Sequence, residues 1–372
     1  MTAPLIAVDA RYGLRAMRRG IGEYVYQLFW ALAELPRPYR VALFGDGSAD
    51  PEVVAAFRRR YPVEILSAPN FFWWEQVAFP QAARRWRAAF VHGTANIAPL
   101  GWAPRAVLTV HDVIEWHRGR DFPGQLAWRH RLSRLYRMNA LAHLAPLCPL
   151  VFTVSEYAAA TVAETLGVAR AHLRVTPLAP KPVPSFPDPA PGARPPFVLV
   201  LGARDERKNL RGAFAALART APPVRFEVVG VEEAAVPWAQ KLAETFGVAE
   251  RVAVRGMVPD AELWALYRAA RALLYPSYEE GFGLPVLEAM RFGCPVIASR
   301  RGAVPEVAGD AALLVDPADP EAMAGAIEAV WRDDDLWAEL ARRGQRRAAR
   351  YTWANTAALT HAGYLALVEG GR

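Results

Sequence analysis

The chain has 372 residues, of which 53% are hydrophobic and 22% charged, so it is long enough for two domains that each bury a core, and its composition excludes a disordered chain. The formal net charge is +7, and the excess lies in residues 1–180, which hold 21 Lys and Arg against 13 Asp and Glu. The only two cysteines, Cys148 and Cys294, stand in apolar surroundings, which favours small buried side chains over disulfides and fits a reducing cytoplasm.

The beginning of the chain predicts a short buried strand. The apolar run Leu5–Val8 reaches Asp9 too early to be the apolar core of a signal peptide. The most apolar later stretch, Leu141–Val154, is interrupted by a histidine and two prolines, so it falls short of the roughly 18 uninterrupted residues that a membrane span needs. We therefore expect a cytoplasmic chain that does not cross a membrane.

Short apolar runs alternate with longer segments of helical period along most of the chain. The runs that predict strands are Val41–Gly45, Phe90–His92, Val107–His111, Val151–Val154, Phe197–Gly202, Phe226–Gly230, Ala272–Tyr275 and Pro295–Ser299. Such alternation is typical of parallel sheets with crossover helices. We therefore expect an α/β protein with two doubly wound, Rossmann-like domains around a central cleft, and ligands bound by the loops that follow the strands.

The domain boundaries follow from one proline-rich stretch. Nine of the twenty residues in 177–196 are proline, which predicts a semi-rigid linker between an N-terminal domain over 1–176 and a C-terminal domain over 197–352. The final segment, Thr352–Val368, has helical period. We expect this segment, about 353–372, to cross back and complete the N-terminal domain.

The strongest local signal is the segment Tyr275–Met290, which reads as the end of a strand, a glycine-bearing turn and a helix that opens at Pro285. Backbone N–H groups at such a helix start can approach phosphate oxygens or sugar hydroxyls closely. We expect Glu288 in the first turn of that helix, ionised and suited to a ribose diol. Glu280, on the loop itself, is placed to meet a sugar.

A second signal, Val198–Leu210, again reads as a strand, a tight turn, cations and a helix. Cations after a strand suit a diphosphate. Lys208 is informative because the chain has 41 Arg and only three Lys, which suggests that a compact point charge is needed at this position. A fixed cation there would stabilise the charge that develops on the leaving phosphate of a sugar nucleotide.

Other site classes find little support in the sequence. Neither the GxGxxG pattern of dinucleotide enzymes nor the GxxxxGK[ST] pattern of P-loop NTPases is present. Histidines and cysteines show no metal-ligand spacing, and the run Asp333–Asp335 is better explained as acids at the start of a helix. We expect no metal and no cofactor.

On these residues the sequence resembles the GT4 family of retaining GT-B glycosyltransferases, and the likeness runs over nearly the whole chain. Glu280 and Glu288, which flank Gly281–Pro285, are similar to the EX7E motif of that family. The resemblance implies that Glu280 and the backbone of Phe282, Gly283 and Leu284 hold the donor sugar, and that Glu288 holds the ribose. Arg207 and Lys208 are similar to the diphosphate-binding pair, with Arg204 as a third cation.

In the first half, Arg19–Tyr24 resembles the N-terminal glycine loop of the family, and Gly20 and Gly22 would border the donor phosphates and the acceptor. Val110–Asp112 resembles the segment that places a histidine, here His111, near the transferred sugar. Two further segments fit family patterns, Thr153–Tyr157 and Gly302–Glu306. Ser155 is equally explained as a helix N-cap, and Glu306 as a surface acid. We expect a strand at Val252–Val254 and the nucleobase pocket after it, near Gly256.

The resemblance implies a metal-independent hexosyltransferase that uses a nucleotide-diphosphate sugar. Its pattern favours GDP-mannose, with UDP- or ADP-hexoses close behind, and a glycan or lipid-linked acceptor. A front-face displacement is expected, in which the leaving diphosphate helps to take the acceptor proton and the protein positions and stabilises charge. Two alternatives remain: a GT-B sugar-nucleotide epimerase, and a non-catalytic sugar-nucleotide or nucleic-acid binding protein.

The basic excess of the first half suggests a further partner. Clusters of arginine there, together with the aromatic run Phe71–Trp74, would attract an anionic membrane, although solvated helix faces explain each cluster equally well. No nucleic-acid module is recognisable, so nucleic acid is not expected. The membrane hypothesis places the protein at the inner face of the cell membrane.

Overall fold

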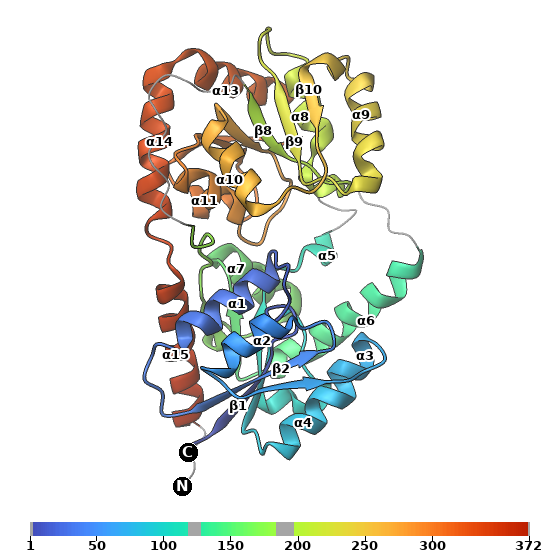
Figure 1. Cartoon of the computed structure of the whole chain (residues 1–372), viewed down its shortest axis with the longest axis vertical. Helices are drawn as coiled ribbons and strands as arrows, with labels where there is room; N and C mark the ends of the chain where they lie inside the picture. Colours follow the sequence, from blue (N-terminus) through green and yellow to red (C-terminus); the bar gives the residue numbers. More distant parts are fainter. Residues whose placement is uncertain (1–2, 118–127, 184–196, 371–372) are drawn as a thin grey trace. The chain divides into compact units, whose positions relative to one another are not determined.

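The computed structural model describes residues 3–117, 128–183 and 197–370, and for 128–133 the backbone alone (Figure 1). The chain divides into two compact units. Unit 1 comprises Met1–Trp116, Leu126–Ala179 and Thr352–Arg372, and unit 2 comprises His117–Gln125 and Pro180–Tyr351. Most of the proline-rich segment expected as a linker lies outside the described residues.

Unit 1 is built on a seven-stranded parallel sheet in the order β3-β2-β1-β4-β5-β6-β7. Its strands are β1 (Leu5–Asp9), β2 (Arg40–Asp46), β3 (Val63–Leu66), β4 (Phe90–Gly93), β5 (Ala106–Val110), β6 (Leu150–Thr153) and β7 (Leu173–Val175). Strand β1 pairs with β2 on one side and with β4 on the other. The connections therefore run outward in both directions from β1 and β4, where doubly wound sheets bind ligands.

The helices of unit 1 connect these strands. They are α1 (Ile21–Leu32), α2 (Pro51–Arg58), α3 (Phe71–Trp73), a π-helical turn η1 (Trp74–Ala78), α4 (Phe79–Arg85), α5 (Ile114–His117), α6 (Trp128–Leu144), α7 (Glu156–Leu166) and α15 (Trp353–Gly370), with short 3-10 turns at Leu100–Arg105, Ala145–Leu147 and Arg170–His172. Although α15 ends the chain, it packs beside α1 (Figure 1). Its Tyr364 hydroxyl lies 2.6 Å from Nδ1 of the buried His92, so this helix forms part of the core of unit 1.

Unit 2 holds a six-stranded parallel sheet in the order β10-β9-β8-β11-β12-β13. Its strands are β8 (Val198–Leu201), β9 (Phe226–Val229), β10 (Val252–Val254), β11 (Ala272–Tyr275), β12 (Val296–Ser299) and β13 (Ala312–Val315). Strands β8 and β11 are neighbours from which the two halves of this sheet run outward. The two longest motifs of the sequence follow these two strands.

The helices of unit 2 cover this sheet. They are α8 (Leu210–Leu217), α9 (Val236–Thr245), α10 (Asp260–Ala269), α11 (Leu284–Arg291), α12 (Val304–Ala308), α13 (Pro320–Arg332) and α14 (Asp334–Ala348), with 3-10 turns at Glu206–Lys208, Glu233–Ala235 and Ala249–Arg251. Helix α11 packs against α14, and α13 against α8. Asp333 caps the start of α14 by accepting the Leu336 N–H at 2.8 Å, so the acid run is the helix start that the sequence predicted.

The structure confirms the predicted fold class, because each unit is a doubly wound parallel sheet. All eight predicted strand segments form strands, and both cysteines are buried. Two local expectations were wrong. Helix α11 begins at Leu284, one residue before Pro285, and Glu288 is its fifth residue and lies beyond the first turn, so the N-terminal dipole acts on it more weakly than expected. None of the helices described is long and apolar enough to span a bilayer.

Candidate active site

In unit 2, the loops after β8 and β11 bring three predicted site residues together. The Glu280 carboxylate accepts from Lys208 Nζ at 2.7 Å and pairs with Arg207 Nη1 at 2.6 Å. Lys208 Nζ also donates to the Tyr275 hydroxyl, at 3.0 Å. Residues 72 positions apart in the sequence thus form one cluster at the point where the halves of the sheet diverge.

The electrostatics of this cluster fix its charge state. Burial alone would raise the pKa of the Glu280 carboxyl, but Lys208 and Arg207 outweigh it and lower the pKa to about 2. Burial likewise opposes the charge of Lys208, yet Glu280 raises the pKa of this amine above its usual value. At neutral pH Glu280 is therefore an ionised acceptor for hydroxyl groups and not a proton donor.

The two cations retain binding capacity beyond Glu280. A guanidinium has five N–H donors and an ammonium three, so Arg207 and Lys208 can hold a carboxylate and a phosphate at once. Arg207 is further fixed by its Nη1, which donates to the Glu279 carbonyl at 2.9 Å. Cations held in this way need little reorganisation when negative charge develops beside them.

Asn209 connects three loops of unit 2, a role that was not predicted from the sequence. Its side-chain amide donates to the carbonyls of Pro276 at 3.2 Å and Pro317 at 2.7 Å, and its oxygen accepts the Gly212 N–H at 3.0 Å. Asn209 adopts φ 55°, a left-handed conformation that asparagine tolerates better than most residues, and is buried. It therefore locks the loop that carries Arg207 and Lys208 to the loop that carries Glu280.

The loop after β12 supports Glu280 from its backbone side. The Ala303 N–H donates to the Glu280 carbonyl at 3.0 Å, and a Cβ at Gly302 would lie 2.8 Å from Glu280 N. Gly302 also has φ +66°, which other residues rarely adopt. The segment Gly302–Glu306, which the sequence analysis noted only because it fits a family pattern, thus supports the backbone of the predicted sugar-binding loop. Glycine is required at its first position.

Helix α11 places the remaining residues predicted for the donor. Gly283 stands at the helix start with φ 96°, and no side chain caps the first-turn N–H groups there. Phe282, Gly283 and Leu284 lead from the loop after β11 into this helix, and their assignment to the donor sugar stays a prediction. Glu288 is half-buried and accepts from the Tyr267 hydroxyl at 3.2 Å, so a buried tyrosine orients its carboxylate.

Two further residues of unit 2 predicted for the donor are Arg204 and Gly256. Arg204 is exposed on the loop that follows β8, before the 3-10 turn that carries Arg207 and Lys208. Gly256 follows the edge strand β10, where its carbonyl accepts the Gly230 N–H at 3.0 Å. A Cβ at Gly256 would meet only the carboxylate end of the exposed Glu233 side chain, which can rotate away, so packing does not by itself require glycine here. Its assignment to a nucleobase pocket stays a prediction.

In unit 1, the predicted glycine loop leads from β1 into α1. Gly20 is the residue before the helix and has φ 50°, and a Cβ at Gly22 would lie 2.8 Å from the Tyr12 carbonyl oxygen. Both positions therefore need glycine for the chain to turn and pack. The loop lies at the carboxyl end of β1, which is the edge of the sheet where ligands bind.

His111 follows β5 at the same edge of the first sheet. Its Nε2 lies 3.0 Å from the Thr94 carbonyl oxygen, which can only accept, so Nε2 carries the proton and Nδ1 is the acceptor nitrogen. Burial lowers the pKa of His111 to about 4, and its ring packs edge-on against Tyr24 at 4.9 Å. The imidazole is therefore neutral at pH 7 and suited to accept a hydroxyl hydrogen bond.

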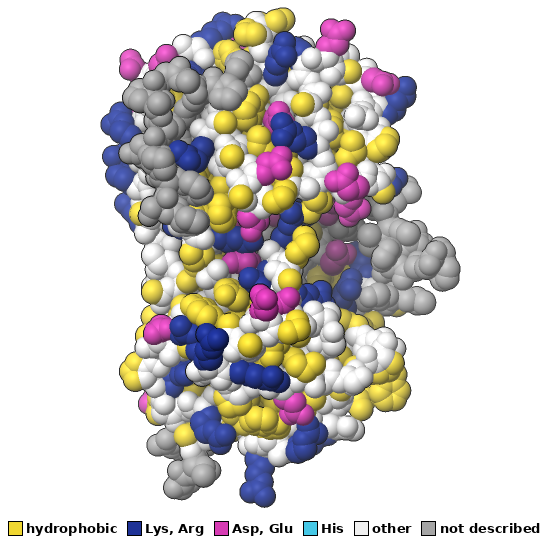
Figure 2. All heavy atoms as spheres, viewed as in Figure 1, with side chains coloured by type: hydrophobic (Ala, Val, Ile, Leu, Met, Phe, Trp, Pro, Cys, Tyr) yellow, Lys and Arg dark blue, Asp and Glu magenta, His cyan; other side chains and the backbone are white. Residues whose placement is uncertain are grey.

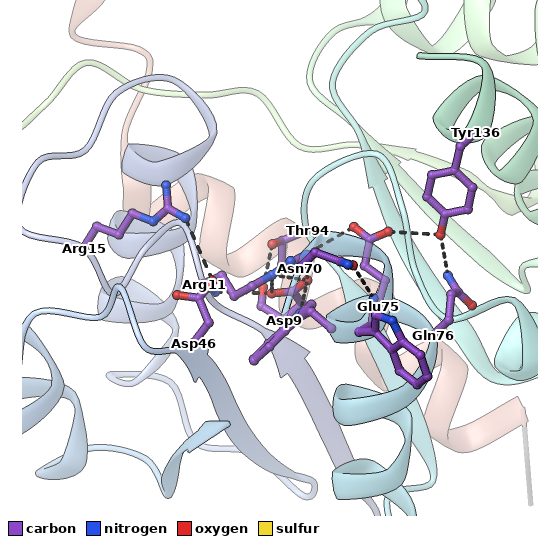
Figure 3. Close-up of polar contacts among 11 residues, drawn as sticks. Asp9, Arg11, Arg15, Asp46, Asn70, Glu75, Gln76, Thr94 and Tyr136 are labelled. Carbon is purple, nitrogen blue, oxygen red and sulfur yellow. Dashed lines mark hydrogen bonds and ion pairs between the residues drawn. The ribbon is translucent and has the colours of Figure 1, made fainter. Parts of the chain in front are cut away.

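A buried polar network that the sequence did not predict lies behind these loops (Figure 3). Arg11 Nη2 donates to Asp9 Oδ2 at 2.7 Å and to Glu75 Oε1 at 3.3 Å, and Tyr136 donates to the other Glu75 oxygen at 3.3 Å. Burial raises the pKa of Glu75 to about 8, against the opposing effect of Arg11. The network joins the end of β1 to η1 and α6 within unit 1.

Ser155 lies at the start of α7. The Ser155 hydroxyl accepts the Ala158 N–H at 2.9 Å, so it caps α7, the simpler of the two interpretations of this residue. Within residues 3–117, 128–183 and 197–370, no group of three or more His, Cys, Asp or Glu side chains is arranged to hold a metal ion. The expectation of metal independence stays a prediction.

Two family models together match most of the chain. Residues 185–347 match the model described as glycosyl transferases group 1, and residues 18–179 match the model described as glycosyltransferase family 4. The chain is 30% identical over 280 residues to an MMP alpha-(1->4)-mannosyltransferase of Mycolicibacterium hassiacum, an alignment that covers 73% of this chain and 67% of the relative.

Another relative matches more strongly over a shorter region. The chain is 35% identical over 164 residues to the O-antigen chain mannosyltransferase B of Escherichia coli, which covers 43% of each protein. With the serotype-specific mannosyltransferase WbdA of Escherichia coli it shares 29% identity over 182 residues, and the alignment covers 22% of that relative. The chain thus matches less than half the length of these curated relatives.

Solved structures match the whole chain. Sucrose-phosphate synthase from Thermosynechococcus elongatus superposes with a TM-score of 0.74 at 21% identity and covers 99% of this chain and 100% of that one. WaaG, a glycosyltransferase involved in lipopolysaccharide biosynthesis, gives a TM-score of 0.72 at 16% identity, covering 99% and 100%. Identities this low show the fold alone. With the family-model matches and the mannosyltransferase relative, they establish that the chain belongs to the GT4 family of glycosyltransferases and has the GT-B fold.

Proposed function

We propose that the protein is a retaining hexosyltransferase that moves a hexose, with mannose favoured, from a nucleotide-diphosphate sugar to a hydroxyl of a glycan or lipid-linked acceptor. The observation that carries this proposal is the ionised Glu280 held between Arg207 and Lys208 where the second sheet diverges. A carboxylate for sugar hydroxyls and two cations for a diphosphate are the groups that such a donor needs. Membership of the family supports the assignment.

The reaction would form one bond and break one at the anomeric carbon of the donor sugar. The bond from this carbon to the diphosphate oxygen breaks, the acceptor oxygen bonds to the same face, and the acceptor proton passes to the leaving diphosphate. Lys208 and Arg207 stabilise the charge on that diphosphate, while Glu280 orients the sugar. This chemistry requires no nucleophile from the chain and no metal ion.

The activities of several relatives support mannose as the transferred sugar. The three relatives described above are mannosyltransferases, which favours GDP-mannose as the donor. Among the structural neighbours, Anabaena Alr3699/HepE was solved with UDP-glucose, at 17% identity and a TM-score of 0.70, so UDP-glucose is the natural alternative to test.

Glu288→Ala is expected to weaken binding of the nucleotide about 10- to 100-fold, because an ionised acceptor for two ribose hydroxyls would be lost. Titration calorimetry with GDP and with UDP, in EDTA, measures the affinity. Glu250→Ala, an exposed acid of the same unit, is the control and should bind as the wild type does. Equal affinity in Glu288→Ala and wild type would contradict the ribose assignment.

We also propose that unit 1 associates peripherally with an anionic membrane. Phe72 and Trp73 on α3 and Leu135 on α6 are each about half exposed, and Phe72 contacts Tyr136 of α6 with ring centroids 5.4 Å apart. Figure 2 shows hydrophobic side chains gathered over the region where Figure 1 places α3. Exposed arginines of this unit, including Arg84 and Arg87, would add attraction to acidic headgroups.

Co-sedimentation with vesicles tests this association. The wild type is expected to pellet with phosphatidylcholine vesicles that contain a quarter phosphatidylglycerol at low salt, and to stay in solution with phosphatidylcholine alone. The double variant Phe72→Ser, Trp73→Ser should lose most of this binding, whereas Leu359→Ser, also exposed in unit 1, should not. Equal pelleting of the double variant and the wild type would refute the role of α3.

A further inference from the structure

Helix α12 contacts the turn Glu280–Gly283, called the donor turn below, at both of its ends. The N–H of Ala303, the residue before the helix, donates to the Glu280 carbonyl at 3.0 Å. At the other end of the turn, a Cβ added to Gly283 would lie 3.3 Å from Val304, the first residue of the helix. The position of α12 therefore determines where the backbone of the donor turn can lie.

Helix α12 is too short to hold its own conformation. It has five residues, whereas isolated helices shorter than about 12–15 residues are marginal in water. Burial of Val304, Val307 and Ala308 fixes one side of it against unit 2. Its last carbonyls have no partner within the helix, because no further turn follows them. The end of α12 therefore needs hydrogen-bond donors from elsewhere in the chain.

Arg347, in the last turn of α14, supplies these donors. Its Nε donates to the Val307 carbonyl at 2.9 Å, and its Nη2 donates to the Glu306 carbonyl at 2.5 Å. A Cβ at Gly309, the residue that follows α12, would lie 3.3 Å from the guanidinium carbon, so glycine there leaves room for the arginine. Arginine side chains bound to the final carbonyls of a helix stabilise its end.

The same guanidinium also holds Tyr351, the last residue of unit 2. Arg347 Nη2 donates to the Tyr351 hydroxyl at 3.0 Å. The Tyr351 ring in turn packs edge-on against Phe282, with the ring centroids 5.9 Å apart. Phe282 belongs to the donor turn and is buried. Arg347 therefore reaches the donor turn by two routes, through the backbone of α12 and through the ring of Tyr351.

Both routes depend on the shape of a guanidinium. Its donors point in several directions in one plane, so it can bind two carbonyls and a hydroxyl at once, which a lysine ammonium on a flexible stem does less well. The Glu280 carboxylate must in turn be held within about 0.5 Å of its productive position to act on a bound sugar. A fixed support for the donor turn meets this requirement.

From these contacts we infer that Arg347 is a positioning residue for hexose transfer, which fixes the donor turn through α12 and Tyr351 and so holds Glu280 toward the donor sugar. The inference rests on the proposed function, because that function assigns Glu280 to the sugar. It also gives the segment Gly302–Glu306 a role, since this segment connects Arg347 to the backbone of Glu280.

Hydrogen–deuterium exchange of the full chain without substrate tests the support directly. Arg347→Met removes the guanidinium and keeps an apolar stem. Amides of residues 302–309 should then exchange at least tenfold faster and those of 278–284 at least threefold faster, whereas β8 should not change. Arg346→Met, at the exposed neighbouring position in the same turn of α14, is the control. Wild-type exchange in 302–309 and 278–284, or equal acceleration throughout unit 2, would overturn the inference.

A double-mutant cycle shows whether Arg347 acts through Glu280. Arg347→Met should lower kcat for transfer about tenfold and leave the affinity for GDP and UDP unchanged. In the Glu280→Gln background the same substitution should lower kcat less than twofold, because the turn no longer carries the carboxylate. A tenfold loss in both backgrounds is the result of a merely structural role and would overturn the inference.

Variants of Tyr351 give a second measurement that does not depend on whether Arg347→Met folds. Tyr351→Phe keeps the ring against Phe282 and should lose less than threefold in kcat, whereas Tyr351→Leu should lose about tenfold. Wild-type kcat in Tyr351→Leu would overturn the inference. If the exchange changes are local as expected but the wild type neither transfers nor hydrolyses any sugar nucleotide, the support of the donor turn stands and the proposed function is overturned instead.

Discussion

Glu280→Gln is expected to lower kcat for transfer about 100- to 1,000-fold while nucleotide affinity changes little, because a charged, pre-oriented hydrogen-bond acceptor for the donor sugar is lost. The carboxylate sits between Lys208 at 2.7 Å and Arg207 at 2.6 Å. The neutral amide would also leave these cations less compensated. Steady-state kinetics with a sugar nucleotide and a mannoside acceptor measures the effect.

The same substitution should lower stability, since removing one partner of a buried ion pair typically costs about 3–5 kcal/mol. Denaturant unfolding measures this loss and shows whether the variant is folded at the assay temperature. Glu250→Gln is the matched control and should keep both activity and stability. A folded Glu280→Gln protein with wild-type kcat would rule out the sugar-binding role of this carboxylate.

The pKa of Glu280 adds a pH dependence of stability. Its pKa is lowered to about 2 in the folded protein, so its ionised form stabilises the fold above the ordinary value of 4.5 and this contribution is lost as pH falls from 4.5 toward 2. Above pH 5 the carboxylate does not titrate. We therefore expect no kinetic pKa from Glu280 in the neutral range.

Lys208→Ala is expected to reduce kcat about 100-fold or more, since a fixed cation beside the leaving diphosphate would be missing from the transition state. Glu280 would retain Arg207 as a partner, so the fold should tolerate the change better than Glu280→Gln. Lys208→Arg should recover little activity, because a planar guanidinium does not replace a compact ammonium that contacts both Glu280 and Tyr275.

Lys241 supplies the control for this experiment. It is exposed on α9 and pairs with Glu244 at 2.9 Å, so Lys241→Ala removes a lysine of the same unit without touching the cluster. The transfer rates of Lys208→Ala and Lys241→Ala are each measured with two donors, one with a good and one with a poor leaving group. If Lys208→Ala lost no more activity with the poor leaving group than with the good one, its assigned role at the diphosphate would be wrong.

The sequence predicted the central strands of both sheets and missed three of the four edge strands. Central strands are buried on both faces and appear as continuous apolar runs, as in β11. The strands that went unrecognised, β3, β7 and β13, lie at sheet edges and are partly exposed, with charged residues in the first two. Half-exposed segments of three or four residues carry too little periodicity to be distinguished from loops.

The candidate site was predictable where its residues lie on contiguous motifs. Glu280, Arg207 and Lys208 were found because strand ends and glycine turns mark them in the sequence. Asn209 could not be assigned, because its role depends on carbonyls at Pro276 and Pro317, far along the chain. The only local signal in the sequence was an asparagine that directly follows Lys208 and precedes the predicted helix.

The Arg11 network could not be predicted either, because it too depends on contacts between residues far apart in the sequence. Asp9 and Arg11 are near neighbours, but Glu75 is 64 residues from Arg11 and meets it only after β1 and η1 are packed. In the sequence these residues look like ordinary charged surface residues. Only the folded structure shows that Asp9, Arg11 and Glu75 are buried.

The most direct test of the central claim is the transfer reaction itself, followed by NMR in EDTA with GDP-mannose or UDP-glucose and methyl α-D-mannopyranoside. The proposed function predicts a disaccharide whose new anomeric centre has the configuration of the donor, formed in proportion to the nucleotide diphosphate released. A product of inverted configuration would contradict the retaining mechanism. Absence of any transfer from GDP-, UDP- and ADP-hexoses to mono- and disaccharide acceptors would contradict the assignment as a hexosyltransferase.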